Sequence, residues 1–384
     1  MFVRRRVEGS ERSALPLIGV AVAWPTPIHR YNKHPTGGKP TLASLHDRWW
    51  GKDLRKLVAD RLGLEQNKVS AVNDANAAAI ATVFDKIRAT HEPTAKRDTY
   101  DKDLPKYEPT NIALTVRIGG GVGAGTVAVG AYSPTHFSAF NDAALIETES
   151  GLAGELGHLV VNSGLLEKIN AHRGELPELM AGAKCDCGER GHLEAYASAT
   201  AFVERLARLE DDVLGELGLS KDESRGNASI MHDVIARIEQ EGAHPTVERA
   251  LQDMGLLLGN ALAGTVLMLS PSSITLAGSA ACEPLSKGFT TGLNEAGAFF
   301  GEDVPVTSTT GVRNRYSSAR GAALFVFRSL VYRQLDEFSR LYTRAGERKL
   351  DDSDRLFSRH MRLIGSGGLP LGVSRARARV STPS

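Results

Sequence analysis

The stretch that decides the fold reads GELGH at Gly154–His158 and, further along, CDCGERGHLE at Cys185–Glu194. Two thiols one residue apart, with a histidine on either side, supply four soft or borderline donor groups, the number that a closed tetrahedral zinc site uses. The alternative is a pair of reduced thiols in a turn, with both histidines satisfied by hydrogen bonds. The spacing predicts a structural Zn²⁺ held by His158, Cys185, Cys187 and His192.

The two motifs together resemble the signature of the ROK family, a group of bacterial repressors and sugar kinases. The resemblance implies an α/β chain with the actin-like (ribonuclease H-like) two-lobe sugar-kinase fold. In that family the last metal ligand is normally a third cysteine, so His192 is a departure. Imidazole is an equally good ligand for zinc, and the metal expectation therefore stands.

A polar quartet, Asn73–Asn76 (NDAN), lies between a short strand expected at 69–72 and an alanine-rich helix. From the residues alone, Asp74 reads as a helix cap that satisfies free backbone N–H groups. The quartet is also similar to the NDAN segment of ROK kinases, whose aspartate is the base facing the sugar hydroxyl. That resemblance assigns the base to Asp74, which would orient the hydroxyl and accept its proton, with Asn73 beside it as a sugar ligand.

The same resemblance assigns further sugar ligands to the GELGH run and to the end of the cysteine motif. They are Glu155, His158 and Glu194. From sequence alone, surface carboxylates are an equally good interpretation of the two glutamates. If His158 binds metal through one ring nitrogen and a hydroxyl through the other, the metal site and the sugar site are coupled.

A glycine cluster interrupts the strand-like run at 111–129 (NIALTVRIGGGVGAGTVAV). Glycines permit close backbone approach to a phosphate, or simply a tight hairpin with positive φ, and the hairpin is favoured from the residues alone. The cluster resembles the second phosphate loop of the ROK family, although Gly120 replaces a hydroxyl residue there. The implied ATP-binding positions are Gly119, Gly121, Gly123 and, after a strand expected at 273–276, Gly278.

Hydrophobic spacing predicts the other elements. These are a strand buried on both faces at 17–24, a helix at 45–62 ended by Gly63, a loop at 86–109, helices at 194–209, 234–241 and 247–269, a last helix at 320–342 and a disordered tail at 347–384. Trp49 and Trp50 near the start of the first helix are read as core, with a sugar cleft as the minority interpretation. The predicted organisation is a partial N-terminal lobe at 1–109, a C-terminal lobe at 110–327, and a C-terminal helix and tail at 328–384.

Composition limits the partners. With 46 Lys and Arg against 45 Asp and Glu, the formal net charge is +1, so no global field recruits nucleic acid or an anionic membrane. Three cysteines do not make a disulfide framework, which favours a reducing cytoplasm. The basic N-terminus lacks an apolar core and so is not a secretory signal. The apolar run at 254–269 is read as a buried helix, and no membrane partner is expected.

The chain contains no Asp-x-Gly-x-Thr motif, with which ROK kinases hold magnesium and the ATP phosphates. The resemblance covers about 17–327 and predicts an incomplete first lobe, with either a mis-assigned start or a degenerate family member as the cause. The expected function is recognition of a hexose or amino sugar by a glucokinase-like protein of poor catalytic power, with ATP and Mg²⁺ bound only if kinase activity is retained. The alternatives are the effector-binding part of a sugar-responsive regulator, without a DNA-binding module of its own, and a purely structural zinc protein. Family resemblance also implies a homo-oligomer.

Overall fold

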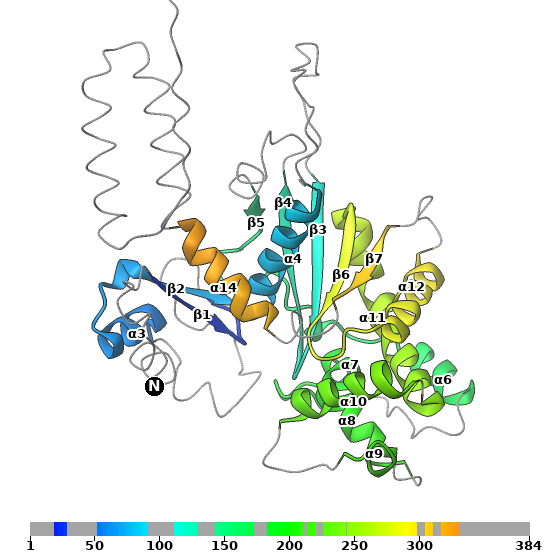
Figure 1. Ribbon diagram of the computed structural model, residues 1–384. Coiled ribbons are helices and arrows are strands. Elements are labelled where there is room, and N and C mark those ends of the chain that lie inside the picture. Colours follow the sequence, from blue (N-terminus) through cyan, green and yellow to red (C-terminus); the bar gives the residue numbers. More distant parts are fainter. Residues whose placement is uncertain are drawn as a thin grey trace, which may run out of the picture. The chain divides into compact units, whose positions relative to one another are not determined.

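The computed structural model describes residues 19–28, 52–90, 111–129, 143–172, 183–209, 213–219, 226–242, 244–297, 304–309 and 316–329. All of them lie in one compact unit, Gly19–Ser329 (Figure 1). Several predictions concern residues outside this description: the roles of Trp49 and Trp50, the C-terminal helix and tail beyond 329, and the lobe boundary at 109/110. The domain division therefore stays a prediction.

The larger sheet is mixed and has the strand order β5-β4-β3-β6-β7. β3 pairs antiparallel with β4 and parallel with β6. Four consecutive residues of β3, 113–116, are buried, as expected for a strand covered on both faces. The strands are β3 (Asn111–Ile118), β4 (Val122–Val129), β5 (Ala144–Leu145), β6 (Ser273–Ala277) and β7 (Val306–Ser308). The α/β class expected from the sequence is confirmed.

A smaller sheet pairs β1 (Val20–Trp24) in parallel with β2 (Val69–Asn73). The expectation that this first strand is buried on both faces is wrong, because all five β1 residues are half-buried. In the described residues β1 has only one neighbouring strand, so part of its surface faces outward. Two helices, α4 (Asp74–Thr90) and α14 (Ser317–Phe327), pack on this sheet and on each other, and α4 also contacts β3 and β4 (Figure 1).

Helix α3 (Leu54–Leu62) begins later than the expected position 45, because Asp53 is its N-cap. The Asp53 side chain accepts hydrogen bonds from the backbone N–H groups of Arg55 and Lys56. At the other end, Gly63 adopts a left-handed φ of 66°, which confirms the predicted stop. The 3₁₀ turn at Gln66–Lys68 then leads into β2.

Other helix boundaries also differ from expectation, among them the start of α10, which lies at Asn227 rather than at 234. The helix expected at 194–209 is broken into α7 (Glu194–Ala197) and α8 (Ala199–Leu206), because the Ser198 hydroxyl accepts a hydrogen bond from Ala201 N and caps α8. The first residues of the loop expected at 86–109 are helical, since α4 continues to Thr90, and the rest of that segment lies outside the described residues. The remaining helices are α6 (Ser163–His172), α9 (Val213–Glu216), α10 (Asn227–Glu241), α11 (Pro245–Leu269) and α12 (Glu283–Ala296).

The long helix α11 packs very closely against α12. Gly259 of α11 lies so near α12 that a Cβ there would overlap Phe289 O and come within 2.8 Å of Leu293 N. Gly288 of α12 faces the backbone of α11 at Gln252 in the same way. By length and composition α11 could cross a membrane, but its buried residues belong to the main core, as in the core helix of a soluble protein. The expected buried helix is confirmed.

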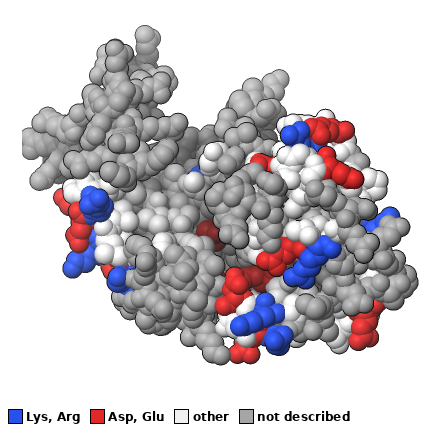
Figure 2. All heavy atoms as spheres, turned by 90° about the horizontal axis from the view of Figure 1, so that it is seen from below, with Lys and Arg blue, Asp and Glu red and all other residues white. Residues whose placement is uncertain are grey.

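Charged side chains of both signs are interspersed over the described surface in Figure 2. Several are paired with an opposite charge four residues away, for example Arg208 with Glu204 and Lys287 with Glu283. Such exposed pairs contribute little to stability, and their mixture fits the near-neutral net charge.

Candidate functional site

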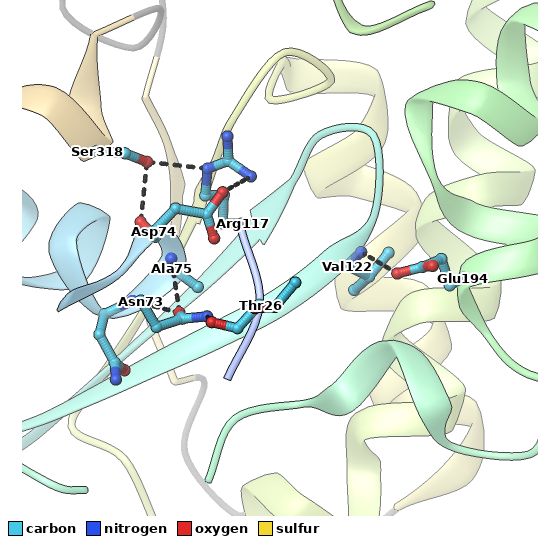
Figure 3. Close-up of polar contacts among 9 residues, drawn as sticks. Thr26, Asn73, Asp74, Ala75, Arg117, Val122, Glu194 and Ser318 are labelled. Atoms are coloured by element: carbon cyan, nitrogen blue, oxygen red, sulfur yellow. Dashed lines mark hydrogen bonds and ion pairs between the residues drawn. The ribbon is translucent and has the colours of Figure 1, made fainter. Parts of the chain in front are cut away.

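The start of α4 is built by Asn73. Its Oδ1 accepts hydrogen bonds from Ala75 N at 2.9 Å and Asn76 N at 3.2 Å, and its Nδ2 donates to Thr26 O at 3.3 Å (Figure 3). The cap of this helix is therefore Asn73, and the capping role considered for Asp74 is wrong. Because both ends of the Asn73 amide are engaged within the protein, its contact with a sugar stays a prediction.

Asp74 is the first residue of α4 and pairs with Arg117 of β3, with 2.8 Å between Arg117 Nη1 and Asp74 Oδ2. Its side chain is only 16% exposed. Burial raises the pKa of Asp74, while the Arg117 charge and nearby backbone N–H groups act in the opposite direction. The sequence reasoning missed Arg117, although it is the only charged residue of the β3 segment, which was the available signal.

The glycine cluster forms the tight turn between β3 and β4, as predicted, with Gly119 N donating to Gly121 O at 2.8 Å. None of its glycines has positive φ, so that part of the expectation is wrong. Their role is close packing: a Cβ on Gly121 would overlap the Glu194 carboxylate, and one on Gly123 would lie 3.1 Å from Ala75 Cβ. The turn thus brings the start of α4 and the start of α7 to the same end of the sheet.

Gly278 follows β6 with a φ of 99°. A Cβ there would lie 2.8 Å from Ile118 C, so only glycine allows this approach to the end of β3. The structure therefore gathers Gly278 and the glycine turn at one end of the paired strands β3 and β6. Their contact with ATP phosphates stays a prediction.

The GELGH run is fixed to β4 at its first residue. Ala124 N donates to Gly154 O at 2.7 Å, and Gly154 has a φ of 94° that favours glycine. Glu155 follows, and burial, together with the charges of Asp74 and Glu194, raises the pKa of Glu155 to about 8. The Glu155 carboxyl is therefore largely protonated at neutral pH and can donate a hydrogen bond as well as accept one.

Glu194 joins the glycine turn to the cysteine motif. Its Oε2 accepts a hydrogen bond from Val122 N at 3.1 Å (Figure 3), and its Oε1 lies 3.9 Å from Cys185 Sγ. Burial raises the pKa of Glu194 above its usual value. Glu155 and Glu194 are both half-buried, so the interpretation of them as surface carboxylates is wrong.

Four potential metal donors gather beside Glu194. One ligand atom from each lies within 4.8 Å of the others, which makes the group small enough to surround one ion. His158 Nδ1 is 3.3 Å from His192 Nδ1, which is 3.2 Å from Cys187 Sγ. Burial and the neighbouring His192 lower the pKa of His158, which favours the neutral, metal-binding imidazole. The four residues are those predicted from the sequence: His158, Cys185, Cys187 and His192.

Backbone hydrogen bonds hold the cysteine turn in place. Cys185 N donates to Glu189 O at 2.9 Å and Gly188 N donates to Cys185 O at 2.9 Å, which closes the turn. Leu193 N donates to Leu159 O at 2.7 Å, which ties the turn to the residue after His158. The donor atoms are thus positioned by backbone structure, as the ligands of a preformed metal site are.

Much of this site lies in a part of the chain that matches a known protein family. Residues 107–286, which include the glycine turn, the GELGH run, the cysteine motif and Gly278, match the family model described as ROK family. Residues 107–286 are a ROK family domain. The chain is 28% identical over 165 residues to a glucokinase of Halalkalibacterium halodurans, covering 43% of the chain and 40% of the relative.

A second curated relative is an N-acetyl-D-glucosamine kinase of Histophilus somni, 29% identical over 151 residues, 39% of this chain and 36% of the relative. The matched part of the chain thus spans only about two fifths of these relatives. Among solved structures it is similar to a ROK family glucokinase from Streptomyces griseus in complex with glucose and AMPPNP. That similarity has a TM-score of 0.54, 19% identity and coverage of 84% of this chain and 86% of the other, and it supports the two-lobe sugar-kinase fold.

Proposed function

We propose that this protein, through its ROK family domain and the segment before it, binds a hexose or amino sugar between Asn73-Asp74 and Glu155-His158-Glu194. The observation that carries the proposal is the convergence of Asp74, Glu155 and Glu194 on the glycine turn, next to the four metal donors. A protonated carboxyl, as expected for Glu155, can both donate to and accept from sugar hydroxyls, whereas an ionised carboxylate accepts only. The relatives add support, because they are a glucokinase and an N-acetyl-D-glucosamine kinase.

The metal part of the proposal is a structural Zn²⁺ at His158, Cys185, Cys187 and His192. The donor set fits, because two thiols and two imidazoles are a common closed zinc sphere. The group lies beside Glu194, whose Oε1 is 3.9 Å from Cys185 Sγ, so the ion would hold the turn that presents this carboxyl to the sugar. Zinc in such a closed site supplies folding energy and leaves no open position for a substrate.

Removing the Glu155 carboxyl is expected to weaken sugar binding. Glu155→Ala leaves a sugar hydroxyl without its partner and should cost about 1–3 kcal/mol of binding free energy, measured by isothermal titration against glucose, N-acetylglucosamine and glucosamine. Glu204→Ala is the matched control, since Glu204 is an exposed carboxylate of α8 that pairs with Arg208. The proposed sugar site would be refuted if the two variants bound sugar with equal affinity, or if the parent chain bound none of these sugars.

Phosphoryl transfer by the 384-residue chain is expected to be slow. The chain carries no Asp-x-Gly-x-Thr motif to hold magnesium and the ATP phosphates in line with the hydroxyl. ADP release with ATP and the best-binding sugar is the measurement. Rapid turnover that Asp74→Asn abolishes would contradict this expectation and identify Asp74 as the base.

The regulator interpretation makes a different prediction for the same assays. It predicts sugar binding without ADP release. It also predicts that the sugar changes the affinity of the regulator's DNA-binding part for its operator. The expectations of a homo-oligomer and a cytoplasmic location also stay proposals. Light scattering on the zinc-loaded chain tests the first of these.

A further inference from the structure

Arg117 is the positively charged residue that pairs with Asp74, the carboxylate proposed to contact the sugar. It lies near the end of β3, two residues before the glycine turn, and its side chain is 27% exposed. Its Nη1 is 2.8 Å from Asp74 Oδ2, and its Nε donates to the Ser318 hydroxyl at 3.0 Å (Figure 3). The guanidinium is therefore held at two of its nitrogens by groups from two different helices.

Ser318 completes this contact. Its hydroxyl accepts from Arg117 Nε and donates to the backbone carbonyl of Asp74 at 2.8 Å. Ser318 lies in the first turn of α14, which packs on α4 so closely that a Cβ on Gly321 would come within 3.0 Å of Ala77 Cα. The Arg117 side chain is thus fixed in front of Asp74 by the junction of β3, α4 and α14.

The charged groups around Asp74 determine whether its ionised form is favoured. Glu155 from the GELGH run faces Asp74 with a like charge when ionised. On α14, the charged residue Arg320 is paired elsewhere, with Asp85 at 2.7 Å. β1 (VAVAW) and β2 (VSAVN) contain no charged residue. Among the described elements packed on the start of α4, the cation acting on the Asp74 carboxyl is therefore Arg117.

We propose that Arg117 is a positioning residue for Asp74: its guanidinium, fixed by Ser318, keeps the Asp74 carboxylate ionised and in one orientation, ready to accept a hydrogen bond from a sugar hydroxyl. Burial opposes ionisation of Asp74, and a guanidinium in contact with a carboxylate offsets that opposition. The claim that Asp74 accepts a hydrogen bond from a sugar rests on the proposed function. The claim that Arg117 keeps Asp74 ionised does not depend on it.

A purely structural tie between β3 and α14 is the competing explanation. A structural tie affects stability when it is cut, but it does not specifically move the titration of Asp74. An electrostatic role does move it, because an opposite charge at this distance lowers a carboxyl pKa by about one to three units. The midpoint of the Asp74 titration therefore separates the two explanations, and no sugar is needed to measure it.

The experiment is ¹³C NMR of the full chain labelled at aspartate Cγ, with the Asp74 signal assigned by its loss in Asp74→Asn. In Arg117→Met the Asp74 midpoint should rise by about one to three pH units, since the charge is lost while most of the side-chain length remains. Arg117→Lys, which keeps the charge, should restore most of the wild-type midpoint. Arg320→Met is the matched control, because it cuts another arginine–aspartate pair between α14 and α4 and should leave Asp74 unmoved.

An unchanged Asp74 midpoint in folded Arg117→Met overturns the proposal. If that variant does not fold, Arg117→Gln provides the test, since it also removes the charge but keeps an N–H donor for the Ser318 hydroxyl, and an unchanged midpoint there has the same meaning. Sugar affinity is the second readout. In Arg117→Met it should recover as the pH rises through the new Asp74 midpoint, because only the ionised carboxylate is a pure acceptor. A moved midpoint with no sugar binding by any form would refute the proposed function and leave the role of Arg117 intact.

Discussion

Cys185→Ser is expected to release the bound metal and to lower the free energy of unfolding by several kcal/mol. Cys185 is 2% exposed and donates one of the four ligand atoms that lie within 4.8 Å of one another. A serine hydroxyl cannot replace a thiolate, and structural zinc supplies apparent binding energies of about 10–16 kcal/mol in small peptides, which sets an upper limit here. Metal analysis and urea unfolding of the purified chain measure the two effects.

The third cysteine provides the control for this prediction. Cys282 is also buried, at 4% exposed, but it lies at the start of α12 and outside the four-donor group. Cys282→Ser should therefore keep about one Zn²⁺ per chain, with only the modest cost of a polar group in a core position. The zinc site would be refuted if the Cys185 and Cys282 variants had equal metal contents, or if the parent protein were stable and carried no metal.

Gly259→Ala is expected to destabilise the protein by about 1–3 kcal/mol or more, because it overpacks the contact between α11 and α12. The added Cβ would overlap Phe289 O and lie 2.8 Å from Leu293 N, and both are backbone atoms that cannot move without displacing α12. The helices would have to separate along a contact that belongs to the main core. Urea unfolding measures the loss.

Gly264→Ala is the matched change in the same helix. A Cβ at Gly264 meets no atom within 4 Å, so the substitution gains helix propensity without a clash. It should stabilise the protein by about 0.5–1 kcal/mol. Opposite signs for the two glycine variants are the expected result, and equal small effects would show that α11 and α12 are not packed as described.

The metal group was predictable because its chemistry is carried by few residue types at short spacing. Three of the four donors lie within eight residues of one another, Cys185 to His192, and such donors can meet through local turn structure alone. Strands and the long core helix were predictable for a related reason, since apolar runs record burial directly. The fold class followed once these elements alternated along the chain.

The less predictable features depend on contacts between distant segments. Arg117 meets Ser318 across 201 positions of sequence, and neither residue belongs to a motif. The break between α7 and α8 depends on a single serine whose side chain can cap a helix or lie within one. The half-buried state of β1 depends on which strands lie beside it, which a local hydrophobic pattern does not record.

The central claim is that the carboxyl groups at the glycine turn hold a sugar, and a crystal structure of the zinc-loaded chain grown with its tightest-binding hexose tests it most directly. The account predicts sugar hydroxyls within about 2.7–3.2 Å of the Asp74, Glu155 and Glu194 carboxyl oxygens, with the Arg117–Asp74 ion pair retained. A sugar bound elsewhere on the chain, or an empty glycine-turn site at a saturating sugar concentration, would contradict it.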